Sequence, residues 1–379
     1  MALSICFLLF IATTFFQPKG ALPTQHASAA LITHESQPLP MPPLLFWLVW
    51  TKTADDWSWL FNGVITALLK HHPRASVRVL ATRLPLDFFA CYAAEGFNIS
   101  VQRYDFEELA RGTPAEPLAA SGKVQGSRFR VAHESDVVRL LLLQKHGGTY
   151  IDTDLLFLRP LDYDIVARSG AGLETSLVGE TQTWGARWHD ARARRINNAI
   201  IHMARAHDPF INCMVGELWA RYDPNEWACI GPDLTAVCYD RLNATAAAAP
   251  GDTGDAGAAL TPQLYPREFF YPLDWRFAWY ANRRRQERLE MYWEKGERWM
   301  TYAYHLYNSH SHLQLEDHRP GGGYERTGGP QPGSWLAEVL ATLDTPAACR
   351  LLEKSTGPIV PAVPKRGDEK FDDGDLYPA

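Results

Sequence analysis

Apolar residues recur with two different periods in the first half of the chain, and the two periods alternate. A continuous apolar run of strand length, Leu44 to Trp50, is followed by helical spacing over Phe61 to His71. Alternation typical of a strand returns over Ser76 to Thr82, and a further strand is predicted over Asn98 to Tyr104. Strands that alternate with helices predict an α/β fold with an open, mostly parallel sheet flanked by helices. Such sheets bind ligands at the carboxyl ends of their strands.

The two ends of the chain lack this pattern. Residues 1–17 are apolar and uncharged, which predicts either a retained signal-anchor or a signal peptide cleaved after an A-x-A site at residues 27–29. Both alternatives place the rest of the chain in the secretory lumen. Residues 18–43 have the composition of a flexible stem, residues 44–345 form the predicted folded domain, and residues 346–379 are expected to be a disordered tail.

Composition narrows the class of protein. With 379 residues, 46% of them hydrophobic and 12% aromatic, the chain can bury a large core. Its net charge of -6 argues against a nucleic-acid partner, which needs a basic surface. Six cysteines show no metal-binding spacing, and the five beyond Cys6 allow up to two disulfides with one thiol left over. Sequons at Asn98 and Asn243 agree with a lumenal location.

One stretch combines a helix, a glycine stop and two aspartates. Apolar residues after Ser135 follow a helical repeat, Ser135 stands where an N-cap is expected, and Gly147-Gly148 provides a left-handed stop. A strand is predicted next, over Thr149 to Leu158, and its alternation puts Asp152 and Asp154 on one face. Two like charges there require a positive partner, because they repel each other and lose hydration.

A divalent cation is the simplest such partner. Carboxylate oxygens suit Mg²⁺ or Mn²⁺, and these ions leave coordination positions open for the oxygens of a diphosphate. The paired aspartates therefore predict a site for a nucleoside diphosphate. Asp136 and Arg139 lie one helical turn apart just upstream, where a plain intrahelical ion pair is the simplest interpretation.

These residues together resemble a known signature, S-D-x-x-R-x-x-x-L-x-x-x-G-G-x-Y-x-D-x-D, from Ser135 to Asp154. It is similar to that of the DXD-containing sugar transferases, and most of all to the α-1,4-glycosyltransferases of the lactosylceramide 4-α-galactosyltransferase type. The resemblance extends over roughly residues 44–343 through INNAI (196–200), GPDLT (231–235), PREFFYPLDW (266–275) and TYAYHLYNSHS (301–311). Tyr307 departs from the pattern, since it stands where the family usually has tryptophan.

The resemblance implies a fold, an activity and a set of roles. The fold is the A-type glycosyltransferase architecture, with residues 44–345 as the catalytic domain. The activity is metal-dependent transfer of a hexose, galactose or N-acetylglucosamine, from a UDP-sugar to a glycan or glycolipid acceptor, with retention and an α-linkage. The implied location is the Golgi membrane, held by the N-terminal segment as in a type II membrane protein. The implied cofactor is Mn²⁺ or Mg²⁺.

The resemblance also assigns individual residues. Asp152 and Asp154 are the catalytic carboxylates and bind the metal together with His305, whereas Asp136, Arg139 and Asn197 contact the donor sugar, with Asn198 as a substitute for Asn197. His305 and Asn308 are assigned to the diphosphate.

Two other classes of protein remain as alternatives. A phosphatase of the haloacid-dehalogenase type also places D-x-D after an apolar strand, but there the motif lies on the first strand and continues differently from Leu156. A catalytically inactive, lumenal sugar-binding homologue would keep the fold without turnover. Hydrolysis of the donor in the absence of acceptor distinguishes an enzyme from such a lectin.

Overall fold

The computed structural model describes residues 43–173, 196–248, 262–272, 301–307, 317–318, 324–325 and 333–349, and they are organised around a seven-stranded sheet. The strand order is β3-β2-β1-β4-β7-β6-β8. The strands are β1 Leu45–Trp50, β2 Ser76–Ala81, β3 Asn98–Gln102, β4 Gly148–Ile151, β6 Gly170–Leu173, β7 Ile196–Met203 and β8 Gln263–Tyr265. All neighbours pair in parallel except β7, which is antiparallel to both β4 and β6. The predicted open, mostly parallel sheet is confirmed.

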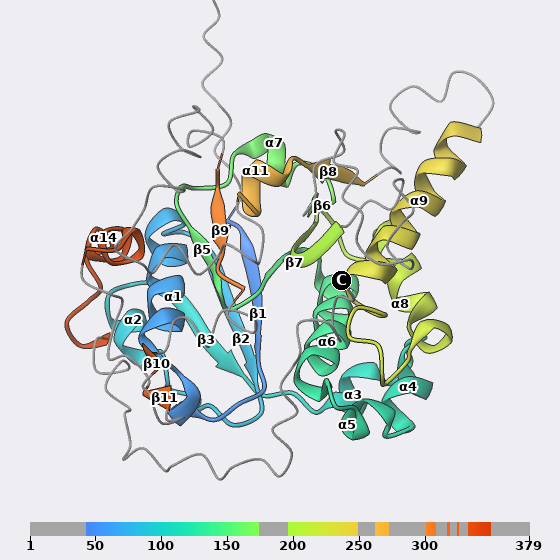
Figure 1. Cartoon of the computed structure of the whole chain (residues 1–379), viewed down its shortest axis with the longest axis horizontal. Helices are drawn as coiled ribbons and strands as arrows, with labels where there is room; N and C mark the ends of the chain where they lie inside the picture. Colours follow the sequence, from blue (N-terminus) through green and yellow to red (C-terminus); the bar gives the residue numbers. More distant parts are fainter. Residues whose placement is uncertain are drawn as a thin grey trace, which may run out of the picture. The chain divides into compact units, whose positions relative to one another are not determined.

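Helices cover both faces of this sheet (Figure 1). One face carries α1 Trp59–His71, α2 Ala90–Ala94 and α14 Trp335–Ala341, and the other carries α6 Arg130–His146, α8 Pro209–Arg221 and α9 Pro232–Ala248. The shorter helices are η1 Ala54–Asp56, α3 Phe106–Ala110, α4 Glu116–Ala120, α5 Lys123–Gly126, α7 Tyr163–Val166 and α11 Arg267–Phe270. Two small ladders complete the described structure, β5 Leu155–Phe157 with β9 Ala303–His305 and β10 Asp317–His318 with β11 Tyr324–Glu325.

β1 shows why the sequence folds into layers. Its side chains alternate between the two cores, with Phe46 and Leu48 packed on the α1 side and Trp47 and Val49 on the α6 side. A strand covered by helices on both faces has no polar face, which explains the continuous apolar run LFWLVW.

The helix before the paired aspartates is longer than predicted. α6 begins at Arg130, so Ser135 lies inside the helix, and its predicted role as an N-cap is wrong. The helix starts where Ser127 accepts two backbone N–H groups, that of Phe129 on its hydroxyl and that of Arg130 on its carbonyl. The Ser135 hydroxyl instead contacts Arg139 and Tyr150, and these long-range contacts were not visible in the local pattern.

The glycine stop is confirmed, and each glycine has a steric reason. Gly147 and Gly148 both have positive φ, 66° and 89°. A Cβ on Gly148 would lie 2.7 Å from the carbonyl oxygen of Leu45, and one on Gly147 would lie 2.9 Å from the backbone of Arg205. Only glycine lets the chain reverse here and enter β4 directly beside β1.

The predicted strand from Thr149 to Leu158 is interrupted, which corrects the sequence interpretation. β4 ends at Ile151, a turn closed by the Leu155 N–H to the Asp152 carbonyl follows, and β5 then joins a different ladder. Strand alternation therefore does not orient Asp152 and Asp154. They belong to a turn between two strands, where 28% of the Asp152 side chain and 14% of the Asp154 side chain are exposed.

The cysteines form the two disulfides and leave the one thiol that the sequence allows in an oxidising compartment. Cys91 pairs with Cys349, Cys213 pairs with Cys238, and Cys229 is the free thiol among the described residues. Because Cys349 is buried and bonded to α2, the predicted tail boundary at residue 346 is too early. Within the described ranges, no helix is both long and apolar enough to span a bilayer. Residues 1–42 lie outside those ranges, so the anchor and the stem stay predictions.

Acidification is expected to destabilise the fold through His72. This imidazole lies between the rings of Phe46 and Phe157, its Nε2 accepts the Leu161 N–H, and its Nδ1 bonds the Leu68 carbonyl. Burial lowers the pKa of His72 to about 4, against the opposing effect of the hydrogen bond to the Leu68 carbonyl. The unfolded chain therefore binds the proton between pH 6.5 and 4, and the stability present above pH 6.5 is lost as the pH falls, by up to about 3 kcal/mol.

The measurement is the free energy of unfolding against pH for the wild type and His72→Gln. The glutamine oxygen still accepts the Leu161 N–H but does not titrate, so the variant's profile should be flatter across this window. Identical slopes for both proteins would contradict the assignment.

Candidate active site

The paired aspartates lie at a switch point of the sheet. From β1 the chain builds β2 and β3 on one side and then returns to form β4 on the other side of β1. Asp152 directly follows β4, and its N–H donates to the Ala199 carbonyl at 2.8 Å. A crevice at the carboxyl ends of the strands, where the strand order reverses, is where open α/β sheets bind ligands.

The small β5–β9 ladder brings His305 to the aspartates. Its register pairs Leu155 with His305, and the Leu306 N–H donates to the Asp154 carbonyl at 3.0 Å. His305 Nε2 lies 3.2 Å from Asp154 Oδ1 and 3.9 Å from Asp152 Oδ2. Two backbone hydrogen-bonded strands, about 150 residues apart in the chain, thus hold the three side chains together.

These three side chains fit a divalent metal ion. One ligand atom from each of Asp152, Asp154 and His305 lies within 4.8 Å of the other two. Two carboxylate oxygens and one imidazole nitrogen suit Mn²⁺, and Mg²⁺ shares the preference for carboxylate oxygen. Asp152 is the most accessible of the three, with 28% of its side chain exposed, so the cluster is open to a ligand on that side.

Arg139 is the centre of a buried network behind Asp152. Its guanidinium lies 3.1 Å from Asp136 Oδ1 and 3.2 Å from Asp152 Oδ1, and it donates to the Asn198 carbonyl at 2.7 Å and to both oxygens of Ser135. The side chain is 5% exposed. Arg139 therefore supplies part of the positive charge that the paired aspartates require, and it fixes one oxygen of Asp152 while the other faces His305.

Tyr150 joins the same network, and the sequence analysis gave it no role. Its hydroxyl donates to Asp152 Oδ1 at 2.7 Å and bonds the Ser135 hydroxyl at 3.1 Å, while the Arg139 guanidinium lies over its ring at 4.3 Å. Local spacing did not reveal this role, because packing of α6 brings Ser135 and Arg139 to the Tyr150 side chain.

Charge in this network is set by burial and by close partners. Burial raises the pKa of Asp136 to about 6, against the opposing effects of Arg139 and the Asn198 amide. Burial disfavours the Arg139 cation, but the oxygens of Asp152, Tyr150, Asp136 and Tyr271 around it raise its pKa above the ordinary value. Arg139 thus stays charged at any pH at which the protein is folded.

Two asparagines of β7 are both buried, and they have different surroundings. The Asn198 amide donates to Asp136 Oδ1 at 2.7 Å. Asn197 accepts the N–H of Ala199 on its own strand. Asn198, named only as a substitute for Asn197, therefore belongs to the network, and a donor-sugar contact by Asn197 stays a prediction. Asn308, assigned to the diphosphate, lies outside the described residues.

Gly231 closes the network from the start of α9. A Cβ at this position would lie 2.9 Å from Asp136 Oδ2 and 2.9 Å from Asn198 Nδ2, and both atoms belong to buried, hydrogen-bonded side chains. We expect Gly231→Ala to lower the free energy of unfolding by about 1–3 kcal/mol, as overpacking of a filled interior does.

Denaturant unfolding checks this, with Gly216→Ala in α8 as the matched control. A Cβ on Gly216 meets no atom within 4 Å, so that variant should be neutral or up to about 1 kcal/mol more stable, as expected for alanine in a helix. Equal effects at the two positions would contradict close packing at Gly231.

Comparison with known proteins agrees with this geometry. Residues 59–171 match the family model for the glycosyltransferase sugar-binding region containing the DXD motif, and residues 203–325 match the α-1,4-glycosyltransferase conserved region. The first match contains Asp136, Arg139, Asp152 and Asp154, and the second contains Gly231 and His305.

Individual relatives are distant. An uncharacterized Arabidopsis thaliana protein is 27% identical over 199 residues, which are 52% of this chain and 28% of that protein. The lactosylceramide 4-α-galactosyltransferase of Mus musculus is 25% identical over 59% of this chain and 58% of its own, and that of Homo sapiens is 23% identical over 62% of each. The matches thus span between about a quarter and three fifths of these relatives' lengths. Similarity to solved structures is weak, with a TM-score of 0.44 and 10% identity to the WbbM bifunctional glycosyltransferase over 83% of this chain and 51% of that one.

The two family regions follow each other in order, and the aspartate pair lies in the first while its histidine partner lies in the second. The chain therefore contains, in this order, a match to the glycosyltransferase sugar-binding region containing the DXD motif and a match to the α-1,4-glycosyltransferase conserved region.

Proposed function

We propose that the chain is a metal-dependent, retaining glycosyltransferase that moves a hexose from a UDP-sugar to a glycan or glycolipid acceptor in α-linkage. The observation that carries the proposal is the convergence of Asp152, Asp154 and His305 at the switch point of the sheet. A nucleoside diphosphate binds well at such a place, because the ligands that hold a divalent cation also hold the diphosphate through it.

Transfer of a sugar from a nucleoside diphosphate requires stabilisation of the departing diphosphate. A bound Mn²⁺ or Mg²⁺ would neutralise the charge that develops on it. Asp154 and His305 would supply two of its ligands, and Asp152, fixed by Arg139 and Tyr150, would supply a third. In the proposed step the acceptor hydroxyl forms the new bond to the anomeric carbon as the bond to the diphosphate oxygen breaks. The hydroxyl proton passes to a diphosphate oxygen on the same face, which gives retention without an enzyme nucleophile.

The finer choices rest on the relatives. Several of them are named lactosylceramide 4-α-galactosyltransferase, which supports a galactose donor, an α-1,4 linkage and a glycolipid acceptor, with N-acetylglucosamine as the other donor to test. The two disulfides support folding in an oxidising compartment. Together with the apolar N-terminal segment, they support a lumenal enzyme of the Golgi membrane with type II topology.

Release of UDP by the full-length protein tests the proposal. A panel of UDP- and GDP-sugars is offered with Mn²⁺, with Mg²⁺ and with EDTA, each with and without lactosylceramide. We expect release from one UDP-sugar that depends on the metal and rises with acceptor. Binding of a sugar without release under any condition would instead support the inactive, sugar-binding alternative.

A further inference from the structure

We propose that Tyr307 is a positioning residue for the metal site, because its ring packs against that of His305, at an interplanar angle of 55°, and sets the direction of the imidazole. The proposal rests on the metal-dependent function above, and it assigns a role to an aromatic residue outside the cluster of possible metal ligands. It concerns how the third ligand, carried on a short strand, is held in place.

The backbone alone does not orient the His305 ring. The β5–β9 ladder fixes the position of the His305 backbone, but the imidazole can still rotate about its side-chain bonds. Its Nε2 nevertheless points at both aspartates, 3.2 Å from Asp154 and 3.9 Å from Asp152. A ligating histidine needs a neighbour that fixes this orientation, and loss of such a neighbour weakens metal binding.

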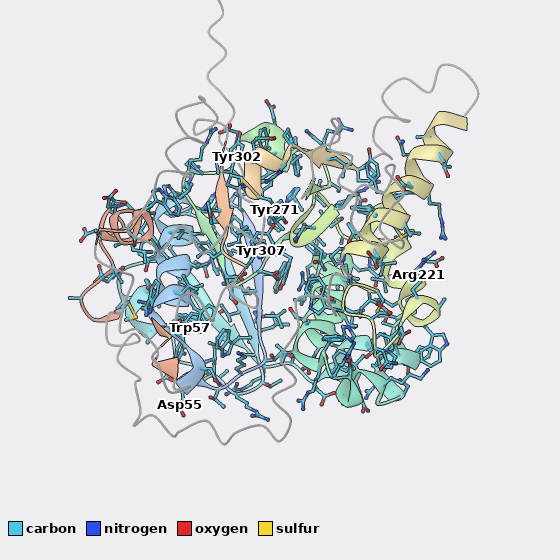
Figure 2. All side chains as sticks on the ribbon, viewed as in Figure 1. Asp55, Trp57, Arg221, Tyr271, Tyr302 and Tyr307 are labelled. Atoms are coloured by element: carbon cyan, nitrogen blue, oxygen red, sulfur yellow. A yellow bond between two sulfur atoms is a disulfide. The ribbon has the colours of Figure 1, made fainter. Side chains whose placement is uncertain are left out.

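Two tyrosine rings are placed to do this. The Tyr307 ring centroid lies 4.0 Å from that of His305, the shortest centroid distance among the aromatic pairs of the described residues. Tyr271 meets His305 edge-on at 5.6 Å and lies 6.4 Å from Tyr307. All three side chains are buried, and Figure 2 shows Tyr271 and Tyr307 close together beside β9. The imidazole is therefore packed between one tyrosine ring tilted by 55° and a second that is nearly perpendicular to it.

The backbone of Tyr307 explains how its ring comes so close. The Cα atoms of residues two apart on an extended strand are separated by about 6.6 Å, whereas the ring centroids of His305 and Tyr307 lie 4.0 Å apart. Tyr307 has φ of 47°, in the left-handed region that side chains with a Cβ rarely adopt. This backbone follows the end of β9 at His305, where the Tyr307 ring contacts the imidazole. An unfavourable backbone beside a ligand cluster is the kind of strain that functional sites retain.

Tyr307→Gly removes the ring but keeps the backbone conformation, because glycine adopts the left-handed conformation without strain. We expect about a 10- to 100-fold rise in the dissociation constant for Mn²⁺, the usual effect of losing a residue that orients a ligand. Tyr307→Phe keeps the ring that contacts His305 and should keep the wild-type affinity. Asp344→Gly is the matched control, because Asp344 also has a left-handed backbone, φ 51°, but is exposed beyond α14.

The experiment measures binding of Mn²⁺ alone to the full-length protein, by the loss of the free-ion electron paramagnetic resonance signal, with no donor present. Thermal unfolding in EDTA shows whether each variant is folded. Unchanged affinity in Tyr307→Gly, with Mn²⁺ still bound by the wild type and lost in Asp154→Asn, overturns the role of Tyr307 and leaves the proposed function standing. Absence of Mn²⁺ binding by the wild type overturns both.

Discussion

Asp154→Asn is expected to abolish metal-dependent UDP release, with a loss of about 10²–10³-fold or more, the range seen when one stabilising group for developing charge is removed. The substitution keeps the size of the side chain and can keep its contact with His305 Nε2, which lies 3.2 Å from Asp154 Oδ1. It removes one of the two negative charges on the cluster. The remaining carboxylate, Asp152, already shares its charge with Arg139, so little is left to attract a cation.

The measurement is the rate of UDP release at saturating donor over a range of Mn²⁺ concentrations. Asp240→Asn, an exposed carboxylate on α9, is the matched control and should behave as the wild type. A rate in Asp154→Asn that stays high and remains sensitive to EDTA would place the functional metal elsewhere and remove the basis of the proposed function.

The layered α/β fold could be predicted from the sequence because the patterns that indicate it are local. The apolar run of β1 reflects burial on both faces, and the glycine pair after α6 reflects a backbone that only glycine adopts at that place. These features depend on neighbours in the sequence. Strand alternation through Asp152 and Asp154 failed because the turn between β4 and β5 is imposed by pairing with β9, far along the chain.

The residue types of the site could be predicted from the sequence, whereas many of the contacts between these residues could not. Asp152, Asp154 and His305 were expected together and do lie together. The contacts of Ser135, Tyr150 and Asn198 with Arg139 or its partners were missed, because a hydroxyl or an amide gives no sign in the sequence of which distant group it will meet. Asp136 and Arg139 were correctly seen as neighbours on a helix, but their burial follows from the packing of α6 against β7 and the start of α9.

This burial changes what Arg139 is expected to do. The resemblance assigns its guanidinium to hydroxyls of the donor sugar, whereas in the structure the group donates to Ser135, Asp136, Asp152 and the Asn198 carbonyl. A guanidinium already bonded in this way fixes its neighbours. The two roles predict different outcomes when the charge is removed.

We expect Arg139→Met to lower the free energy of unfolding by about 3–5 kcal/mol, because it leaves the Asp136 carboxylate buried without its cation. The matched control is Arg111→Met, which breaks another pair of i,i+3 geometry with Glu108. There both side chains are more than 60% exposed, and the expected loss is below about 1 kcal/mol.

Adding Asp136→Asn to Arg139→Met should restore part of the stability, since the second change removes the unpaired charge. If Arg139→Met unfolds as the wild type does and only the Michaelis constant for the donor rises, the arginine binds sugar and does not hold the carboxylates. Loss of stability together with recovery in the double variant instead makes Arg139 the cation around which the catalytic carboxylates are arranged.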